Sequence, residues 1–279
     1  MTSRQCVEPF QLSINGGTAY WMARCAKTVS QRKQDGSPDA NAMLADLQRE
    51  DPGFVGVVPF HNDNSSAVLV EHADYFTLAF RGTDELRDWL DNANLLATTT
   101  DYGEFHRGFH GATERIWPQI YTYYQQRRSQ VRKDDHKPKG LFLTGHSLGG
   151  AMAIVAAAQL VHHDVGFTGV YTFGQPRAVR PRTADLLTLR AHNRIHRFQN
   201  NNDVVPRVPA RMMGYSHCGN YMHIMQNKTI VHDPGLWLRF LDAKDGILDD
   251  ITDRDLATFE DHMMEDYLLA IEQWRISTS

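Results

Sequence analysis

One serine in this chain has the surroundings of a nucleophile. Ser147 is the central residue of Gly-His-Ser-Leu-Gly at positions 145–149, with an apolar run before it and an alanine-rich stretch after it. This order predicts a strand, a sharp turn and a helix, so that the serine projects from a strained bend. Glycines on both sides remove Cβ atoms that would clash with the neighbouring strand and helix. The serine would also stand at a helix N-terminus, where free N–H groups and the helix dipole favour negative charge.

A serine hydroxyl is a weak nucleophile until a base takes its proton, and a carboxylate is needed to orient that base. After a serine in this strand–turn–helix setting, the acid comes next along the chain and the base last. Asp203 follows a predicted strand that ends near Gln199, at the same sheet edge as Ser147, and we expect it to be the acid. The other acids after the serine, for which a solvated loop position or a helix cap is the plainer role, are Asp164, Asp185 and Asp233.

The histidines after Asp203 are the candidates for the base: His217, His223, His232 and His262. His262 precedes a helical pattern of core residues that comprises Met263, Met264, Tyr267, Leu268 and Ile271. These residues alone leave the base open, chiefly between His262 and His217. A surface position at a helix N-terminus is the plain structural interpretation of His262.

Composition narrows the class of protein. The chain has 279 residues, 42% of them hydrophobic, which suffices for one large α/β domain with a sizeable core. Its net charge of -4 does not favour nucleic acid as a partner. Three scattered cysteines, Cys6, Cys25 and Cys218, do not form a disulfide or zinc pattern, and we expect them to be buried as small apolar residues.

The sequence predicts no membrane anchor. No apolar run reaches the length that spans a membrane, and the N-terminus lacks the apolar region of a signal peptide. A cytoplasmic protein, or one exported by a route that needs no such signal, is the resulting expectation. Oligomeric state is left open.

Strands and helices alternate along the chain, which predicts a mostly parallel central sheet with helices on both faces. We expect helices over 17–27, over 37–50 with Ser37 as N-cap and Pro38 as first residue, and over 112–132 with a kink or restart at Pro118. The predicted strands are an adjacent pair over 67–71 and 75–80, the run before Ser147, and the segments 168–173 and 194–198. Residues 1–279 would form a single domain in which 1–60 covers the sheet.

Five segments occur in an order that resembles the class 3, or fungal-type triacylglycerol, lipases. They are Phe-Arg-Gly-Thr at 80–83, His-Arg-Gly-Phe at 106–109, Gly-His-Ser-Leu-Gly-Gly at 145–150, Thr-Phe-Gly-Gln-Pro at 172–176 and Asn-Asp-Val-Val-Pro at 202–206. The resemblance covers roughly residues 65–265, whereas the first 50 or so carry no matching motif. It implies an α/β-hydrolase fold and the hydrolysis of carboxylic esters, commonly those of lipids.

The resemblance also implies roles for particular residues. His262 resembles the family's catalytic histidine, which opens the C-terminal helix, and His217 resembles a structural segment. An oxyanion hole needs donors aimed at the developing charge, and one is the backbone N–H of Leu148, after the nucleophile. Thr83 resembles the family's second donor, although it would also serve as a helix N-cap. His106 is assigned a packing role.

Residues 84–99 are the expected position of a lid. Leu86, Trp89 and Leu90 recur at helical spacing, and we expect them to contact substrate. An ordinary amphipathic helix packed on the core is the alternative. The charged residues that crowd this segment also leave room for a simple esterase without interfacial activation.

These observations predict a serine carboxylic-ester hydrolase, most consistent with a lipase that hydrolyses acylglycerols, possessing a Ser147–Asp203–His262 triad. Phospholipase A1 and short-chain carboxylesterase are the alternatives, because such enzymes share the catalytic residues and differ in loops. An inactive binding module is a remote alternative. A metal hydrolase is not favoured, since His-Glu-x-x-His is absent and the adjacent His162 and His163 make a poor chelate. No cofactor and no metal are implied. The expected partner is a lipid or other ester substrate at a lipid–water interface.

Overall fold

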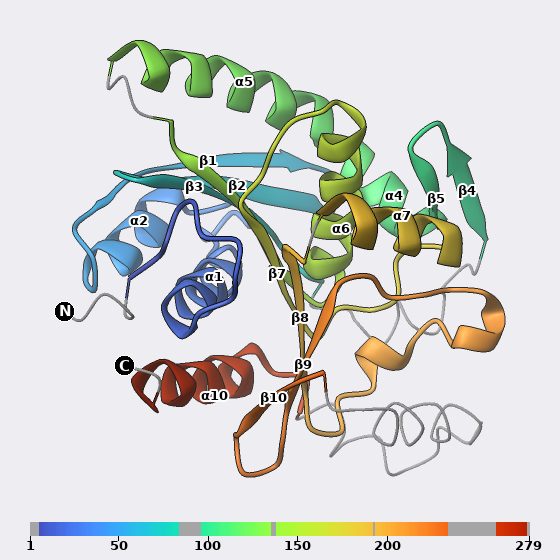
Figure 1. Cartoon of the computed structure of the whole chain (residues 1–279). Coiled ribbons are helices and arrows are strands. Elements are labelled where there is room, and N and C mark those ends of the chain that lie inside the picture. The colour runs from blue at the N-terminus through green and yellow to red at the C-terminus, as the bar shows by residue number, and fades with distance from the viewer. Residues whose placement is uncertain (1–5, 84–95, 135–137, 192, 234–260, 278–279) are drawn as a thin grey trace.

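The computed structural model describes residues 6–83, 96–134, 138–191, 193–233 and 261–277. Within these residues the centre is an eight-stranded sheet with the order β1-β2-β3-β6-β7-β8-β9-β10 (Figure 1). The strands are β1 (Phe54–Asn62), β2 (Ser65–His72), β3 (Tyr75–Phe80), β6 (Gly140–His146), β7 (Gly169–Phe173), β8 (Ile195–Asn200), β9 (Asn220–Ile224) and β10 (Ile230–His232).

The middle of the sheet is parallel and its two ends are antiparallel. Strands β3, β6, β7, β8 and β9 run in one direction. The hairpins β1–β2–β3 and β9–β10 are antiparallel. The expected strands at 67–71, 75–80, 168–173 and 194–198 are all present, so the prediction of a mostly parallel sheet is confirmed. The carboxyl ends of the parallel strands therefore meet at one edge of the sheet, where such folds place their sites.

Helices cover both faces of the sheet, as predicted (Figure 1). One face packs against α4 (Arg107–Glu114), α5 (Trp117–Asp134), α6 (Leu148–His162) and α7 (Pro181–Ala191). The other packs against α1 (Gly16–Thr28), α2 (Ala40–Gln48) and α10 (Met264–Ser277). Alternation along β6 shows why: Leu141 and Leu143 join the first core and Phe142 joins the second. Burial of each such side chain contributes about 1.5–3 kcal/mol.

The N-terminal region differs from its prediction in two details. Helix α2 begins at Ala40, and its N-cap is Asp39, whose carboxylate accepts from the Ala42 N–H at 3.0 Å. The prediction of Ser37 as N-cap was wrong, because Pro38 pairs instead with Arg32 in a β-bridge that holds the chain extended there. Residues 54–60 belong to β1 and so form part of the sheet. Helix α1 lies over the sheet, where Thr144 donates to the Met22 carbonyl at 3.0 Å.

A proline divides the long helical pattern over 112–132. Helix α4 ends at Glu114, and α5 starts at Trp117 with Pro118 as its second residue. A missing N–H has no consequence in the first turn of a helix, so the restart predicted at Pro118 is what the structure contains.

A small second sheet lies beside α4 and α7 (Figure 1). It is the hairpin of β4 (Ala97–Thr100) and β5 (Gly103–His106). The Glu104 N–H donates to the Thr183 hydroxyl at 2.8 Å, which fastens the hairpin to α7. Two short 3₁₀ helices follow β8: η2 (Val205–Arg207) and η3 (Arg211–Met213).

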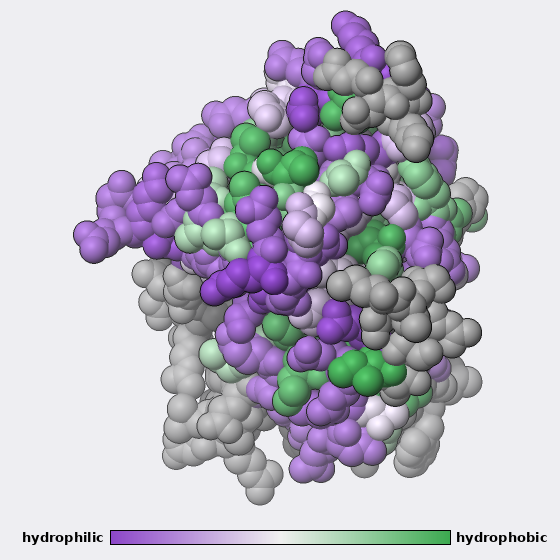
Figure 2. Space-filling model, turned by 90° about the vertical axis from the view of Figure 1, so that its left-hand side faces the viewer, coloured by the Kyte–Doolittle hydropathy of each residue, from purple (hydrophilic) through white to green (hydrophobic). Residues whose placement is uncertain are grey.

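The surface is mainly hydrophilic on the side that carries the two chain ends. Figure 2 shows hydrophobic side chains there in small spots between hydrophilic ones. No helix among the described residues is long and apolar enough to cross a membrane. Cys25 and Cys218 are buried as expected, but the prediction was wrong for Cys6, which is exposed near the start of the described chain.

Candidate active site

Ser147 occupies a strained turn between β6 and α6. Its φ of 56° and ψ of -128° lie outside the regions that an ordinary side chain prefers. Close packing explains the flanking glycines: a Cβ atom on Gly145 would lie 2.3 Å from the Gly149 carbonyl carbon, and one on Gly149 would lie 2.2 Å from the Phe80 carbonyl oxygen. The expected strand, turn and helix are therefore present at residues 140–162.

The backbone of Ser147 is hydrogen-bonded, whereas its side-chain hydroxyl is not. The Ser147 N–H donates to the Phe173 carbonyl at 2.9 Å, which fixes the turn against β7. Ser147 is only 1% exposed, and its Oγ has no hydrogen-bond partner among the described residues. A buried hydroxyl without a partner is uncommon in folded proteins and indicates a position reserved for another group.

Asp203 and His262 meet at the same edge of the sheet. Asp203 lies just after β8, His262 lies just before α10, and His262 Nδ1 is 2.8 Å from Asp203 Oδ2. Both residues are buried. A carboxylate accepts hydrogen bonds, so Nδ1 carries the proton and Nε2 of the neutral ring is left as an acceptor. This Nε2 is also buried without a partner among the described residues.

A tyrosine that the sequence interpretation treated only as core completes the contacts of the acid. The Tyr267 hydroxyl donates to Asp203 Oδ2 at 2.5 Å and accepts from the Asn200 N–H at 2.9 Å. Asp203 Oδ1 accepts from the Val205 N–H at 2.9 Å. Burial, then the charge of Asp203, raises the pKa of Tyr267 well above its usual value, so the phenol remains a donor.

Gly174 makes room for this pair of residues. It has a φ of +58°, and a Cβ atom there would lie 2.7 Å from His262 Cε1 and 2.9 Å from Asp203 Oδ2. The same stretch of chain contacts Ser147, because Phe173 accepts the Ser147 N–H. Phe173 and Gly174 therefore bring the serine, the histidine and the aspartate around one bend after β7. The Thr-Phe-Gly-Gln-Pro motif was the sequence signal for this position.

The segment before α10 is tied to the loop after β8. The Asp261 carbonyl accepts from the Asn200 side-chain amide at 2.9 Å, and the Asp261 carboxylate accepts from the Asn201 side chain at 3.0 Å and the Asn202 N–H at 3.2 Å. These bonds place His262 beside Asp203 although 59 residues separate them in the sequence. Sequence reasoning gave no role to Asp261, and nothing in its local pattern singles it out.

The two expected oxyanion donors, Leu148 and Thr83, are each next in sequence to a residue that belongs to the nucleophile turn or contacts it. Leu148 is the first residue of α6, where the N–H groups have no intrahelical acceptor. Thr83 directly follows Gly82, at which a Cβ atom would lie 2.9 Å from the His146 carbonyl oxygen and 3.4 Å from Ser147 Cβ. The chain just before Thr83 thus contacts the nucleophile turn.

The expected lid falls mostly outside the described residues. Leu86, Trp89 and Leu90 belong to the part of the chain that the structure does not describe. Residues 97–99, the end of the expected segment, lie in β4 and pair with β5. A lid in this region would therefore end before Ala97.

The competing residues lie elsewhere. Asp164, Asp185 and Asp233 are exposed. His217 is enclosed, with Nε2 2.7 Å from the Pro206 carbonyl oxygen. His232 is exposed in β10, and His223 contacts the Tyr221 hydroxyl at 2.9 Å. His106, which sequence analysis assigned to packing, lies against Phe109 and Tyr215, and burial lowers its pKa to about 4.

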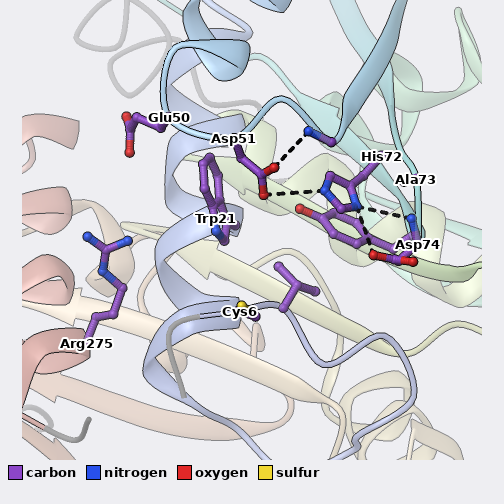
Figure 3. A pocket seen from close by; sticks show the side chains of 11 residues that line it. Cys6, Trp21, Glu50, Asp51, His72, Ala73, Asp74 and Arg275 are labelled. Atoms are coloured by element: carbon purple, nitrogen blue, oxygen red, sulfur yellow. Dashed lines mark hydrogen bonds and ion pairs between the residues drawn. The ribbon is translucent and has the colours of Figure 1, made fainter. Parts of the chain in front are cut away.

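A pocket of about 650 Å³ lies away from these residues. It is lined by the end of β2 and the start of β3, hence at the amino ends of the parallel strands. Figure 3 shows His72 between two carboxylates, with Asp51 at 3.4 Å and Asp74 at 3.7 Å. Among the described residues no group of three or more His, Cys, Asp or Glu side chains could hold a metal ion.

The architecture is that of the α/β-hydrolase fold. Lipase II from Rhizopus niveus aligns with 74% of this chain and 78% of its own, with a TM-score of 0.62 and 20% identity, which establishes the common fold. Residues 77–213 match the family described as Lipase (class 3). The match spans just under half of the chain, and over these residues the chain is similar to the class 3 lipases.

Sequence relatives agree with this assignment over part of their length. A secreted mono- and diacylglycerol lipase, LIP1 of Malassezia globosa, is 31% identical over 164 residues, which are 57% of this chain and 51% of the relative. Phospholipase A1-II 1 of Oryza sativa subsp. indica is 25% identical over 196 residues, or 63% of this chain and 49% of the relative. The chain thus matches about half of the length of these relatives.

Proposed function

We propose that this protein is a serine carboxylic-ester hydrolase that acts on acylglycerols. The observation that supports the proposal is the buried Asp203–His262 pair, which contacts His146, the residue next to Ser147. Both His262 Nε2 and Ser147 Oγ are buried without a hydrogen-bond partner among the described residues. A base oriented by a carboxylate and a serine in a strained turn are the requirements of acyl transfer. The described residues contain no competing set of the same kind.

In the proposed reaction Ser147 Oγ attacks the ester carbonyl carbon while its proton passes to His262 Nε2. Asp203 stabilises the imidazolium, and the Leu148 and Thr83 N–H groups donate to the oxyanion of the tetrahedral intermediate. The alcohol then leaves with the proton from His262, and an acyl-Ser147 ester remains. A water molecule, deprotonated by His262, attacks this ester, and collapse releases the carboxylic acid and regenerates Ser147.

The match to the class 3 lipase family over residues 77–213 and the names of the relatives support an acylglycerol as the substrate. Leu86, Trp89 and Leu90 are proposed to cover the acyl chain as part of a lid. The Malassezia relative is named as a secreted enzyme, which supports export of this protein in preference to a cytoplasmic location. Export is tested by comparing activity in the medium and in the lysate of the producing cells.

Phospholipase A1 is the second candidate, because a rice relative carries that name. The two activities differ in the head group that the substrate site accepts, which loops determine. Rates on monoacylglycerol, diacylglycerol, triacylglycerol and phosphatidylcholine of the same acyl chain decide between them. A phosphatidylcholine rate above all three glycerides would overturn the acylglycerol assignment.

Replacement of Ser147 tests the hydrolase proposal itself. Ser147→Ala is expected to lower turnover of a soluble ester by about 10⁶-fold, the scale seen when one triad member of a serine hydrolase is removed. It should also abolish covalent labelling by a fluorophosphonate. Ser216→Ala, which changes a serine outside the site, is the matched control and should leave both intact. A folded Ser147→Ala protein with full activity would refute the assignment.

A further inference from the structure

The residue before the nucleophile contacts the proposed base directly. His146 is the last residue of β6, and its Nε2 lies 2.7 Å from the backbone carbonyl oxygen of His262. The two imidazole rings also contact each other in a tilted arrangement, with centroids 4.4 Å apart and an angle of 33° between the ring planes. The carbonyl can only accept, so His146 is the Nε2–H tautomer.

His262 needs such a contact because its own backbone lies outside helix and strand. Among the described residues, α10 begins only at Met264, two residues later. The backbone of His146, by contrast, is paired in the sheet, where it lies opposite Phe173. The bond from His146 therefore connects an irregular segment to the strand that ends at Ser147.

We propose that His146 is a positioning residue that fixes the backbone of His262 relative to Ser147 through its Nε2–H donor. Asp203 sets the rotation of the imidazole from its Nδ1 side, and His146 sets the position of the residue that bears it. These two contacts, together with the bonds of Asp261 to the loop after β8, determine where His262 Nε2 lies. This inference rests on the proposed function, since it assigns a role in the same site.

The charge of His146 suits this arrangement. Burial, then the nearby His262, lowers the pKa of the His146 imidazole well below its usual value, so His146 is neutral at neutral pH. A neutral neighbour does not oppose the positive charge that proton transfer places on His262. The donor also remains available, because the Nε2 proton is retained in the neutral ring.

Two substitutions test the hydrogen-bond donor and the aromatic ring of His146 separately. His146→Phe keeps an aromatic ring and removes the donor, whereas His146→Gln removes the ring and keeps an N–H at a similar reach. We expect His146→Phe to lower kcat on a soluble short-chain ester by about 10- to 100-fold, as misplacement by about 1 Å does. KM should stay within about twofold, because His146 does not contact substrate in this scheme. His146→Gln should restore kcat to within about fivefold of the unmodified protein.

The matched control is His196→Phe. His196 is also a largely buried strand histidine that contacts another ring, Tyr171 at 4.9 Å, but it lies near the start of β8, two strands from β6. Rates are expressed per site labelled by fluorophosphonate, so unfolded protein does not count. Equal kcat for His146→Phe and His196→Phe would overturn the proposal, as would a His146→Gln enzyme as slow as His146→Phe. An unmodified protein that neither hydrolyses esters nor takes the label would instead overturn the proposed function.

A measurement on the unmodified protein covers the case in which His146→Phe does not fold. Long-range ¹H–¹⁵N correlation spectra of ¹⁵N-histidine-labelled protein report which ring nitrogen carries the proton. The proposal requires the Nε2–H tautomer at His146, assigned by its loss in His146→Gln. An Nδ1–H tautomer would leave the His262 carbonyl without its donor and would overturn the proposal.

Discussion

His262, which is buried, and His217, which is half-buried, have the same pattern of contacts and different partners. Each has one ring nitrogen in a short contact with oxygen and one nitrogen buried without a partner among the described residues. The contact of His262 is the Asp203 carboxylate, whereas that of His217 is the neutral Pro206 carbonyl. An imidazolium at His262 would gain a stabilising negative charge, and one at His217 would face several guanidinium groups.

Burial and a ring nitrogen without a partner therefore do not suffice to make a histidine a general base. Arg197, Arg177 and Arg211 add to burial in lowering the pKa of His217 well below its usual value. A group that resists protonation so strongly cannot hold a serine proton during a reaction. His217 is therefore better suited to keep the loop around Pro206 in place. The following experiments test whether the two histidines differ in role.

Removal of each histidine in turn gives the largest expected difference. His262→Ala should lower kcat/KM for a soluble ester by about 10⁶-fold, because loss of the base is equivalent to loss of the triad. His217→Ala should stay within about tenfold of the unmodified enzyme when rates are expressed per labelled site. An active His262→Ala enzyme beside an inactive His217→Ala enzyme would reverse the assignment.

Neutralising the acid should have the next largest effect. Asp203→Asn keeps the shape of the side chain but turns an acceptor toward a donor, so the opposite tautomer of His262 is favoured. We expect a loss of about 10⁴-fold in kcat with the fold retained. Asp185→Asn, at an exposed position in α7, is the control and should have no measurable effect. If both variants keep full turnover, Asp203 is not the acid.

Removing the phenol that contacts the acid should have a modest effect. Tyr267→Phe deletes the donor to Asp203 Oδ2 while the ring remains in the core. The free energy of unfolding should fall by about 1.5–3 kcal/mol, the range for a hydrogen bond to a charged group. Tyr171→Phe, at a buried tyrosine of β7, serves as the control. An unchanged urea midpoint for Tyr267→Phe would show that the short contact does not stabilise the protein.

The smallest expected effect concerns stability below neutral pH. Above the ordinary histidine pKa, near 6.5, His217 is neutral in both folded and unfolded chains, so pH has no effect through it. Below that pH the unfolded chain binds a proton that folded His217 refuses, and the free energy of unfolding falls by up to about 1.4 kcal/mol per pH unit.

His217→Gln keeps an N–H for the Pro206 carbonyl and lacks the titration. Its urea midpoint should therefore rise relative to that of the unmodified protein between pH 7 and pH 5. His61→Gln, at an exposed position, should show no such trend. A constant difference between His217→Gln and the unmodified protein across this range would mean that folded His217 accepts the proton.

The elements around the nucleophile were predictable from local patterns. A strand, a glycine-flanked serine and an alanine-rich helix follow one another within residues 140–162, and each is specified by neighbours in the sequence. Helix α1 and the β2–β3 pair were predictable for the same reason. The N-cap of α2 was not, because the bridge between Arg32 and Pro38 outweighed the preference of proline for a first helical position.

The fold class, the position of the candidate nucleophile and the expected order of acid and base after it followed from the sequence alone, because these depend on short patterns of apolar, glycine and polar residues. Only the tertiary structure placed His262, and not His217, against Asp203, and added Gly174, Tyr267 and His146 to that contact. The reason is distance along the chain: the His262 and Asp203 side chains come from segments 59 residues apart. The order of strands in the sheet and the bonds of Asp261 to the loop after β8 bring such segments together, and neither is written in any local pattern.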